Sequence, residues 1–256
     1  MITLGIDSGT QSTKSIALDT ETGEVIGSAQ TAYELLGGLP PGHLEQDPAD
    51  WVRAVDITVR RVVEALGERR REIVGIGVSG QQHGMVVLDE ADAVVRPAKL
   101  WCDTSTTAQC AEFEEAFGGT QGLIELAGNA MLPGYTAPKL LWLKQNEPEN
   151  FMRVRCLLLP HDYLNFHLTG EKRMEYGDAS GTALLDVRSR TWCEPLLRHI
   201  DPDALALLPP LHSSRQPCGL LREELRRQFD LPDSVVVGAG GGDNMMAVSY
   251  THLTLP

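Results

Sequence analysis

An α/β fold is predicted by three features of the first eighty residues. Segments 2–6, 13–18 and 24–30 alternate apolar with small or polar residues, and turn-forming residues separate them. A helical pattern then runs over residues 47–66, and an apolar strand pattern covers residues 73–78. We therefore expect a mixed sheet that opens with a three-stranded antiparallel meander and is flanked by helices.

The local sequence indicates where the elements begin and end. Asp47 and Pro48 provide a cap and a first-turn proline for the first helix. The polar turn at 79–84 leads into another short strand at 85–88, and three consecutive valines predict a buried strand at 235–237. Apolar periodicity predicts four further helices, over residues 104–117, 137–146, 162–169 and 220–229.

Composition indicates a soluble globular protein and narrows its partners. The 256 residues, 42% of them hydrophobic, can bury one large core or two small ones. A net charge of −13 opposes binding to nucleic acid and to anionic membranes. The apolar runs are far shorter than the roughly 20 residues that span a bilayer, and no targeting segment is visible. The five cysteines are widely spaced and lack a Cys-x-x-Cys pair, which favours a reducing, cytoplasmic setting.

The most informative stretch follows the valine strand near the end of the chain. Glycine at 238 and three glycines at 240–242 precede Asp243 and Asn244. Glycine permits φ > 0 and lets backbone approach a ligand closely, so Asp243 is expected in a cleft, presented as a general base. An ordinary Asx turn after a strand is the alternative.

A second candidate site is the hairpin at residues 7–14, which places a carboxylate at a strand end before glycine, three hydroxyl side chains and a lysine. These groups suit a magnesium-bound polyphosphate, with Asp7 holding the metal through water. The hairpin lacks the lysine ending and helix of a Walker loop, and an ordinary polar turn is the alternative. The groups predicted to bind the phosphates are Gly9, Thr10, Gln11, Ser12 and Lys14.

Two further loops carry side chains that suit a polyol. Gln82 and His83 follow a strand, and both side chains can donate and accept hydrogen bonds. Trp101 and Asp103 combine an aromatic face for C–H groups with an acceptor for hydroxyls. The alternatives are a solvated histidine and a half-buried tryptophan at a helix start. Segments 178–182 and 161–163 are weaker signals, which a cap or a turn would also explain.

In this order along the chain, the segments resemble the FGGY carbohydrate kinases, and within that family the kinases of xylulose. The likeness extends to about Ala247. The hairpin at 5–14 is similar to the family's phosphate-binding opening, and residues 134–146 fit its thirteen-residue first signature. Gln82 and His83 resemble the pentulose kinases, whereas glycerol kinases carry an Arg-Glu pair in this loop. Ser105, where arginine is common, and His161, where lysine is common, depart from the family pattern.

The resemblance implies an actin-like, ribonuclease H-like fold and ATP-dependent phosphorylation of D-xylulose to D-xylulose 5-phosphate with Mg²⁺. It implies that Gln82 and His83 contact the sugar and that Asp243 accepts the proton of O5, with Asn244 beside it. Trp101 and Asp103 would line the same pocket. A homodimer is left open.

The resemblance also implies a domain division. Residues 1–238 would form the sugar-binding domain, and residues 239–256 would begin the ATP-binding domain, with an unmatched tail at 248–256. We therefore expect the chain to be the sugar-binding half of a longer kinase, inactive by itself. The alternatives are another FGGY kinase, for ribulose, fuculose or gluconate, and a non-catalytic sugar-binding module.

Overall fold

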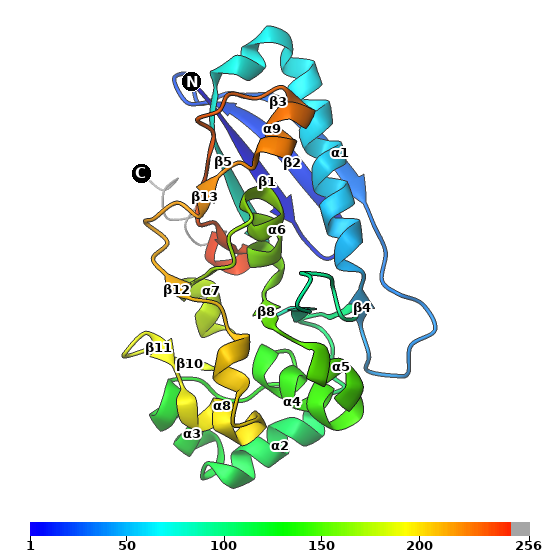
Figure 1. Cartoon of the computed structure of the whole chain (residues 1–256), viewed down its shortest axis with the longest axis vertical. Helices are drawn as coiled ribbons and strands as arrows, with labels where there is room; N and C mark the ends of the chain where they lie inside the picture. The colour runs from blue at the N-terminus through cyan, green and yellow to red at the C-terminus, as the bar shows by residue number, and fades with distance from the viewer. Residues whose placement is uncertain (247–256) are drawn as a thin grey trace.

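The structure is a computed structural model that describes residues 1–246, and its largest element is a seven-stranded mixed sheet (Figure 1). Its strands are β1 (Ile2–Ser8), β2 (Ser12–Asp19), β3 (Val25–Ala32), β5 (Ile73–Gly80), β13 (Gly219–Leu220), β14 (Val236–Val237) and β15 (Gly241–Gly242). β1, β2 and β3 form an antiparallel meander, as predicted. β5 lies parallel to β1, and both β14 and β15 pair with the other edge of β5 in parallel. The predicted mixed sheet is confirmed.

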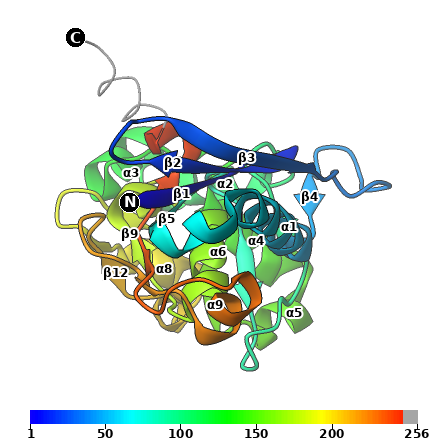
Figure 2. The same cartoon turned by 90° about the horizontal axis from the view of Figure 1, so that it is seen from above.

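Three helices cover one face of this sheet: α1 (Pro48–Leu66), α6 (Pro160–Thr169) and α9 (Glu223–Phe229). Figure 2 shows α1 and α9 on the same side of the meander strands. α1 begins where the sequence predicts, because the Asp47 side chain accepts a hydrogen bond from the Ala49 amide. Its apolar residues recur every three or four positions, which places one stripe of them against the sheet.

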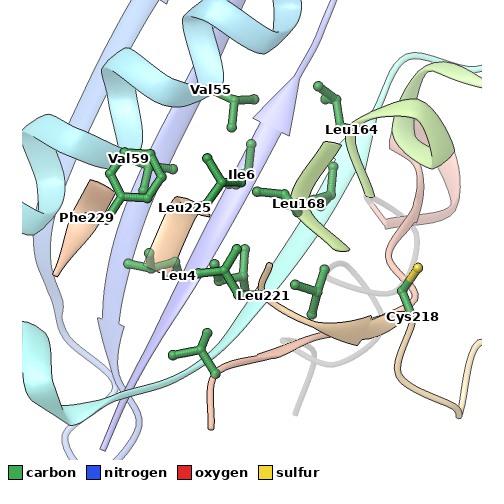
Figure 3. Packing of buried hydrophobic residues seen from close by; sticks show 14 of the residues in the cluster. Leu4, Ile6, Val55, Val59, Leu164, Leu168, Cys218, Leu221, Leu225 and Phe229 are labelled. Carbon is green, nitrogen blue, oxygen red and sulfur yellow. The ribbon is translucent and has the colours of Figure 1, made fainter. Parts of the chain in front are cut away.

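The main hydrophobic core lies between this stripe and the strands (Figure 3). Leu4 and Ile6 point from β1 to the helices, since alternate residues of a strand face the same side. Val55 of α1 and Phe229 of α9 meet them there. Each fully buried side chain of this size contributes roughly 1.5–3 kcal/mol relative to an exposed one.

A second core holds together the helical region at the other end of the molecule (Figure 1). Its helices are α2 (Thr107–Ala116), α3 (Gly119–Ala127), α4 (Thr136–Asn146), α5 (Pro148–Arg153), α7 (Tyr176–Ser180) and α8 (Glu194–Ile200). Short ladders connect this region, namely β4 (Glu45–Gln46) with β7 (Ala98–Lys99), β6 (Val86–Leu88) with β8 (Cys156–Leu158), β9 (Met174–Glu175) with β12 (Leu211–His212), and β10 (Leu185–Asp186) with β11 (Thr191–Trp192). Two 3₁₀ turns, Gly67–Glu72 and Ala204–Leu207, complete the elements of the described chain.

Some predicted boundaries were wrong. The helix expected from residue 104 begins at Thr107, and the helix expected from residue 220 begins at Glu223, because Leu220 pairs in β13. The valine strand is shorter than predicted, and Val236 is exposed between two buried neighbours. Four short helices of five to nine residues, α3, α5, α7 and α8, were not predicted, since so few turns show little periodicity.

None of the helices in residues 1–246 is long and apolar enough to cross a membrane. All five cysteines carry free thiols, and four of them are buried. Burial raises the pKa of the Cys110 and Cys156 thiols to about 11, which keeps them protonated near neutral pH.

Candidate active site

Three neighbouring parallel strands end at the same edge of the sheet, and the predicted site residues follow those ends. In the register of β1, β5 and β15, Asp7 pairs with Ser79, and Ser79 pairs with Gly241. Asp7 therefore lies at the end of β1, the Gln82 loop follows β5, and Asp243 follows β15. The carboxyl ends of parallel strands are a common place for ligand binding in α/β proteins.

A pocket of about 170 Å³ opens at this edge. Its lining residues are Thr10, Gln82, His83, Trp101, Asp243 and Asn244. Two hydrogen bonds join its lining segments in pairs: Asn244 Nδ2 donates to Gln82 Oε1 at 3.1 Å, and Trp101 Nε1 donates to Thr10 Oγ1 at 3.0 Å. Five of the predicted substrate and catalytic residues thus gather in one place, together with Thr10, which was predicted for the phosphates.

His83 is held in an unusual conformation at the pocket. Its φ is 59°, in the left-handed region that non-glycine residues seldom adopt, and its ring packs on Tyr135 with centroids 4.7 Å apart. Burial lowers the pKa of His83, so the ring is neutral near pH 7. A neutral imidazole offers one donor and one acceptor, which suits a hydroxyl group.

The His83 carbonyl is fixed by Lys139, a fully buried lysine of α4. The Lys139 ammonium donates to the carbonyl oxygens of His83 and Gly134, each at 2.7 Å. Burial lowers the pKa of Lys139 to about 7. A buried lysine is costly unless its donors are satisfied, and here two of the three are used to hold the loop that carries His83.

Asp103 lies apart from the pocket and is completely buried. One carboxylate oxygen accepts from the Leu44 amide and lies 3.2 Å from Lys99 Nζ, and the other accepts from the amide and hydroxyl of Ser105. These hydrogen bonds outweigh burial and lower the pKa of Asp103. Contact between Asp103 and a sugar would require this network to open.

Asp243 is half-buried at the pocket wall and begins a helical segment that reaches Met246 in the described chain. Its Oδ1 accepts from the Asn244 amide at 2.8 Å. Burial raises the pKa of Asp243, and the negative charges of Asp7 and Asp178 add to the rise. A raised pKa makes this carboxylate a better proton acceptor than an exposed aspartate.

The glycines before Asp243 are required by close packing. Gly240 has a φ of 68°, and a Cβ built on it would lie 2.2 Å from the Val78 carbonyl oxygen. A Cβ on Gly242 would lie 2.5 Å from Gln82 Cγ and 2.7 Å from Asp178 Oδ1. The backbone at Gly240 and Gly242 therefore passes too close to its neighbours for a side chain, which explains these two glycines of the run.

The hairpin predicted to bind phosphates is a tight turn closed by a hydrogen bond from the Gly9 amide to the Ser12 carbonyl at 3.0 Å. The Tyr33 hydroxyl donates to the Gly9 carbonyl, and Gln46 Nε2 donates to the Thr10 carbonyl. Gln11 is exposed, as are Asp7 and Lys14, which face each other across β1 and β2. Carboxylate, hydroxyl and ammonium groups on one open surface fit a magnesium-bound polyphosphate in their chemistry.

Two other groups of three residues in the described chain bring metal-ligating atoms within 4.8 Å of one another. In the first, Lys99 Nζ lies 3.2 Å from both Glu45 and Asp103, so an ammonium already supplies the cation. The second comprises His161, Asp162 and Asp178, which are buried, and the histidine is bonded to Asp178 at 2.5 Å. Neither group has the open position that a catalytic metal needs.

A larger cleft of about 750 Å³ lies next to β15, where Gly240 and Gly241 contribute to its wall. Arg190 and Arg215 line it together with several hydroxyl side chains. The residues predicted to bind the sugar are absent from its described lining and line the smaller pocket, apart from Asp103.

Sequence reasoning missed the buried residues whose hydrogen bonds hold the loops of this site in place. Gln46 Oε1 accepts from both Trp51 Nε1 and Gln81 Nε2, which joins α1 to the loop after β5. Lys139 could have been noticed as a lysine among the buried apolar residues of α4. The pairing of His161 with Asp178 carries no such local signal.

Comparison with known proteins identifies the family. Residues 2–249 match the sequence model of the FGGY family of carbohydrate kinases, N-terminal domain. The xylulose kinase of Haemophilus influenzae is 40% identical over 254 residues, which cover 97% of this chain and 51% of that protein. The chain thus spans about half the length of the curated relatives it matches.

Solved structures agree. The crystal structure of a xyloylose kinase from Brucella ovis is similar with a TM-score of 0.88 and 36% identity, covering 95% of this chain and 49% of that one. A gluconate kinase from Lactobacillus acidophilus shares the fold at 23% identity, with a TM-score of 0.87 and coverage of 96% and 49%. These likenesses confirm the predicted actin-like fold, and the chain belongs to the FGGY family of carbohydrate kinases.

Proposed function

We propose that the protein to which this chain belongs transfers the γ-phosphoryl group of ATP to D-xylulose, forming D-xylulose 5-phosphate, and that the chain is its sugar-binding half. The observation that carries the proposal is the pocket in which Asp243 meets Gln82, His83 and Asn244. Relatives described as xylulose kinases support the choice of sugar.

The pocket residues divide the work of binding a ketopentose. Gln82, His83 and Asn244 supply hydrogen-bond donors and acceptors for hydroxyl groups, and Thr10 adds a hydroxyl bonded to Trp101. The half-exposed Trp101 offers an aromatic face to the C–H side of the sugar. The neutral His83 can bond to a hydroxyl without adding a charge that would compete for the phosphates.

Asp243 orients the attacking hydroxyl and accepts its proton. An ordinary aspartate, with a pKa near 4, is a weak base for an alcohol, so most of its effect comes from alignment. Burial and the neighbouring carboxylates raise the pKa of Asp243, which makes it a stronger proton acceptor. Asp7, at the end of β1 on the far side of β5, would hold Mg²⁺ through water, and the bound ion would screen the charge of the phosphates.

The turn after β1 would receive the phosphate end of ATP. A Cβ on its Gly9 would meet only the Ser12 carbonyl oxygen, at 3.9 Å, and the hydroxyl residues Thr10 and Ser12 flank exposed Gln11 in the sequence. Lys14 would add a positive charge on the same surface.

In this proposal residues 1–238 are the sugar-binding domain and residues 239–256 begin the ATP-binding domain. The protein would act in the cytoplasm, where ATP is available; the homodimer stays a prediction.

A calorimetric sugar panel tests the proposal on the chain itself. We expect D-xylulose to bind more tightly than D-ribulose, L-fuculose or D-gluconate, and ATP to bind weakly because most of its site would lie in the second half. Gln82→Ala should abolish the preference, because its amide is bonded to Asn244 at the pocket wall. Tighter binding of another sugar would reassign the substrate within the family. Absence of binding to every sugar in the panel would contradict the proposal.

A non-catalytic sugar-binding module is the competing function, and the same panel cannot separate it from a kinase. The discriminating measurement is phosphoryl transfer by the protein extended through its second half. Turnover of D-xylulose there supports the kinase. Tight sugar binding without turnover would support the module.

A further inference from the structure

A buried cluster of ionisable side chains lies next to the strand that presents Asp243. His161 and Asp162 come from the first turn of α6, and Asp178 comes from α7. His161 Nδ1 lies 2.5 Å from Asp178 Oδ2, and His161 Nε2 lies 3.1 Å from Asp162 Oδ1. All three residues are at most 2% exposed, so the cluster lies in the interior and not on the surface.

The cluster contacts the backbone immediately before Asp243. A Cβ on Gly240 would lie 3.4 Å from His161 Cδ2, and a Cβ on Gly242 would lie 2.7 Å from Asp178 Oδ1. One turn along α6 from His161, Asn165 Nδ2 donates to the Ala239 carbonyl at 2.6 Å. The path of β15 is therefore set by side chains of α6 and α7.

Helix α7 also reaches the other wall of the pocket, which carries His83. The Gly181 amide donates to the Asp178 carbonyl at 2.9 Å. A Cβ on Gly181 would lie 2.5 Å from His83 Nδ1, so the end of α7 packs directly against the His83 ring. A displacement of Asp178 would move both the strand before Asp243 and the surface that supports His83.

The charges in the cluster favour one arrangement. Burial disfavours an imidazolium, but Asp162 and Asp178 outweigh burial and raise the pKa of His161 to about 9. Burial raises the pKa of Asp162 well above its usual range. Glu175 of β9 also raises the pKa of His161, and His161 in turn lowers the pKa of His212 in β12. At neutral pH His161 is therefore an imidazolium, and its 2.5 Å hydrogen bond to Asp178 is charge-assisted.

We propose that the Asp178–His161 pair is a positioning element of the sugar pocket, which fixes β15, and with it Asp243, against the wall that carries His83. The proposal rests on the proposed function for the role of Asp243. Neither side chain touches the pocket, so the pair acts through the strand and not on the sugar. Removing the Asp178 carboxylate would break its hydrogen bond to the buried His161 and leave Asp162 as the remaining acidic neighbour, and α7 would shift in response.

The test uses the chain of this sequence, one variant at Asp178 and two variants at His161. In the ¹⁵N-labelled protein we expect both His161 ring nitrogens to carry protons at pH 7.5. Asp178→Asn should lower the pH at which His161 titrates and shift the amide resonances of residues 240–243. It should weaken D-xylulose binding by roughly tenfold, the size of effect usual for residues that act through others. His161→Lys, which keeps a cation, should retain affinity within about threefold, whereas His161→Gln should lose about tenfold.

Helix α6 offers a matched control. Its other histidine, His167, is bonded to Asp56 of α1 at 3.0 Å, away from the pocket. Asp56→Asn removes a carboxylate from a histidine on the same helix, and it should leave the amides of residues 240–243 and the sugar affinity unchanged.

The outcomes separate the two claims. Failure of the unmodified chain to bind D-xylulose would count against the proposed function, while the amide shifts would still report on the pair. A neutral His161 at pH 7.5 would overturn the proposal, as would Asp178→Asn with unchanged amides and affinity. If Asp178→Asn does not fold, two other results test the proposal. They are the protonation of His161 in the unmodified chain and the difference in D-xylulose affinity between His161→Lys and His161→Gln.

Discussion

Two turns at the pocket each combine glycine with an aspartate, and they differ in what surrounds the glycine. Around Gly240 and Gly242 the protein itself fills the space, with a carbonyl oxygen and two side chains closer than a Cβ could tolerate. Beside Gly9 the nearest atom to a Cβ would be the Ser12 carbonyl oxygen at 3.9 Å, and its φ lies outside the left-handed region.

The difference teaches that glycine has two functions at this site. In the turn before Asp243 it lets a strand pass close to α6 and α7, so the carboxylate is held by packing. In the turn after Asp7 it leaves an open surface that a ligand can approach. Glycine in the turn before Asp243 therefore maintains the fold, whereas glycine in the turn after Asp7 gives a ligand access to the backbone.

Alanine substitution in the two turns tests this contrast and should give the largest effect. Gly240→Ala should destabilise the chain by about 3 kcal/mol, because alanine is strained at this φ and its Cβ would overlap the Val78 carbonyl oxygen. Gly9→Ala should stay within about 1 kcal/mol of the unmodified chain, since neither strain nor overlap arises there. Urea unfolding followed by circular dichroism measures both.

The Gly9 variant sharpens the comparison further. In the protein extended by its second half, we expect Gly9→Ala to reduce phosphoryl transfer although stability is kept. Equal stability losses in the two variants would break the contrast between the turns.

A smaller, pH-dependent effect is expected at Lys139, which holds the His83 loop. Its pKa is lowered from 10.5 to about 7 by burial, so between these values the unfolded chain binds the proton more readily than the folded chain. Stability from this group therefore rises as pH increases from about 7 toward 10, with a slope of at most about 1.4 kcal/mol per pH unit. The unfolding free energy of the unmodified chain minus that of Lys139→Met should increase across this range.

We compare the unmodified chain with Lys139→Met because His161 is present in both. The raised pKa of His161 makes the unfolding free energy fall with pH between about pH 6.5 and 9, and this contribution cancels in the difference. Lys144→Met is the control, since Lys144 lies on the same helix, is partly exposed and makes its bonds far from the pocket. A difference for Lys139→Met that is flat with pH would refute the role of burial in lowering its pKa.

Local sequence patterns predicted the elements that depend on local interactions. The meander follows from alternation and turns, α1 from its Asp47 cap and apolar stripe, and the tight turn before Asp243 from consecutive glycines. Joining the loops after β1, β5 and β15 into one pocket came from the family resemblance, because the ends of parallel strands far apart in sequence reveal their proximity only in the folded sheet.

What the sequence could not reveal are contacts between distant polar side chains in the interior. Asp103 was predicted at the sugar, yet its oxygens bond to Leu44, Lys99 and Ser105. The pairing of His161 with Asp178 joins helices seventeen residues apart, and neither residue type nor spacing signals it. Such bonds satisfy groups that burial would otherwise penalise, so they depend on the completed fold.

The account depends most on Asp243, and substitution in the protein extended through its second half tests it directly. Asp243→Asn keeps the shape of the side chain but removes the proton acceptor. We expect D-xylulose phosphorylation to fall by at least about a hundredfold, in line with the loss of a general base, while sugar affinity stays within about tenfold. Turnover within a few fold of the unmodified protein would contradict the assignment of Asp243 as the base.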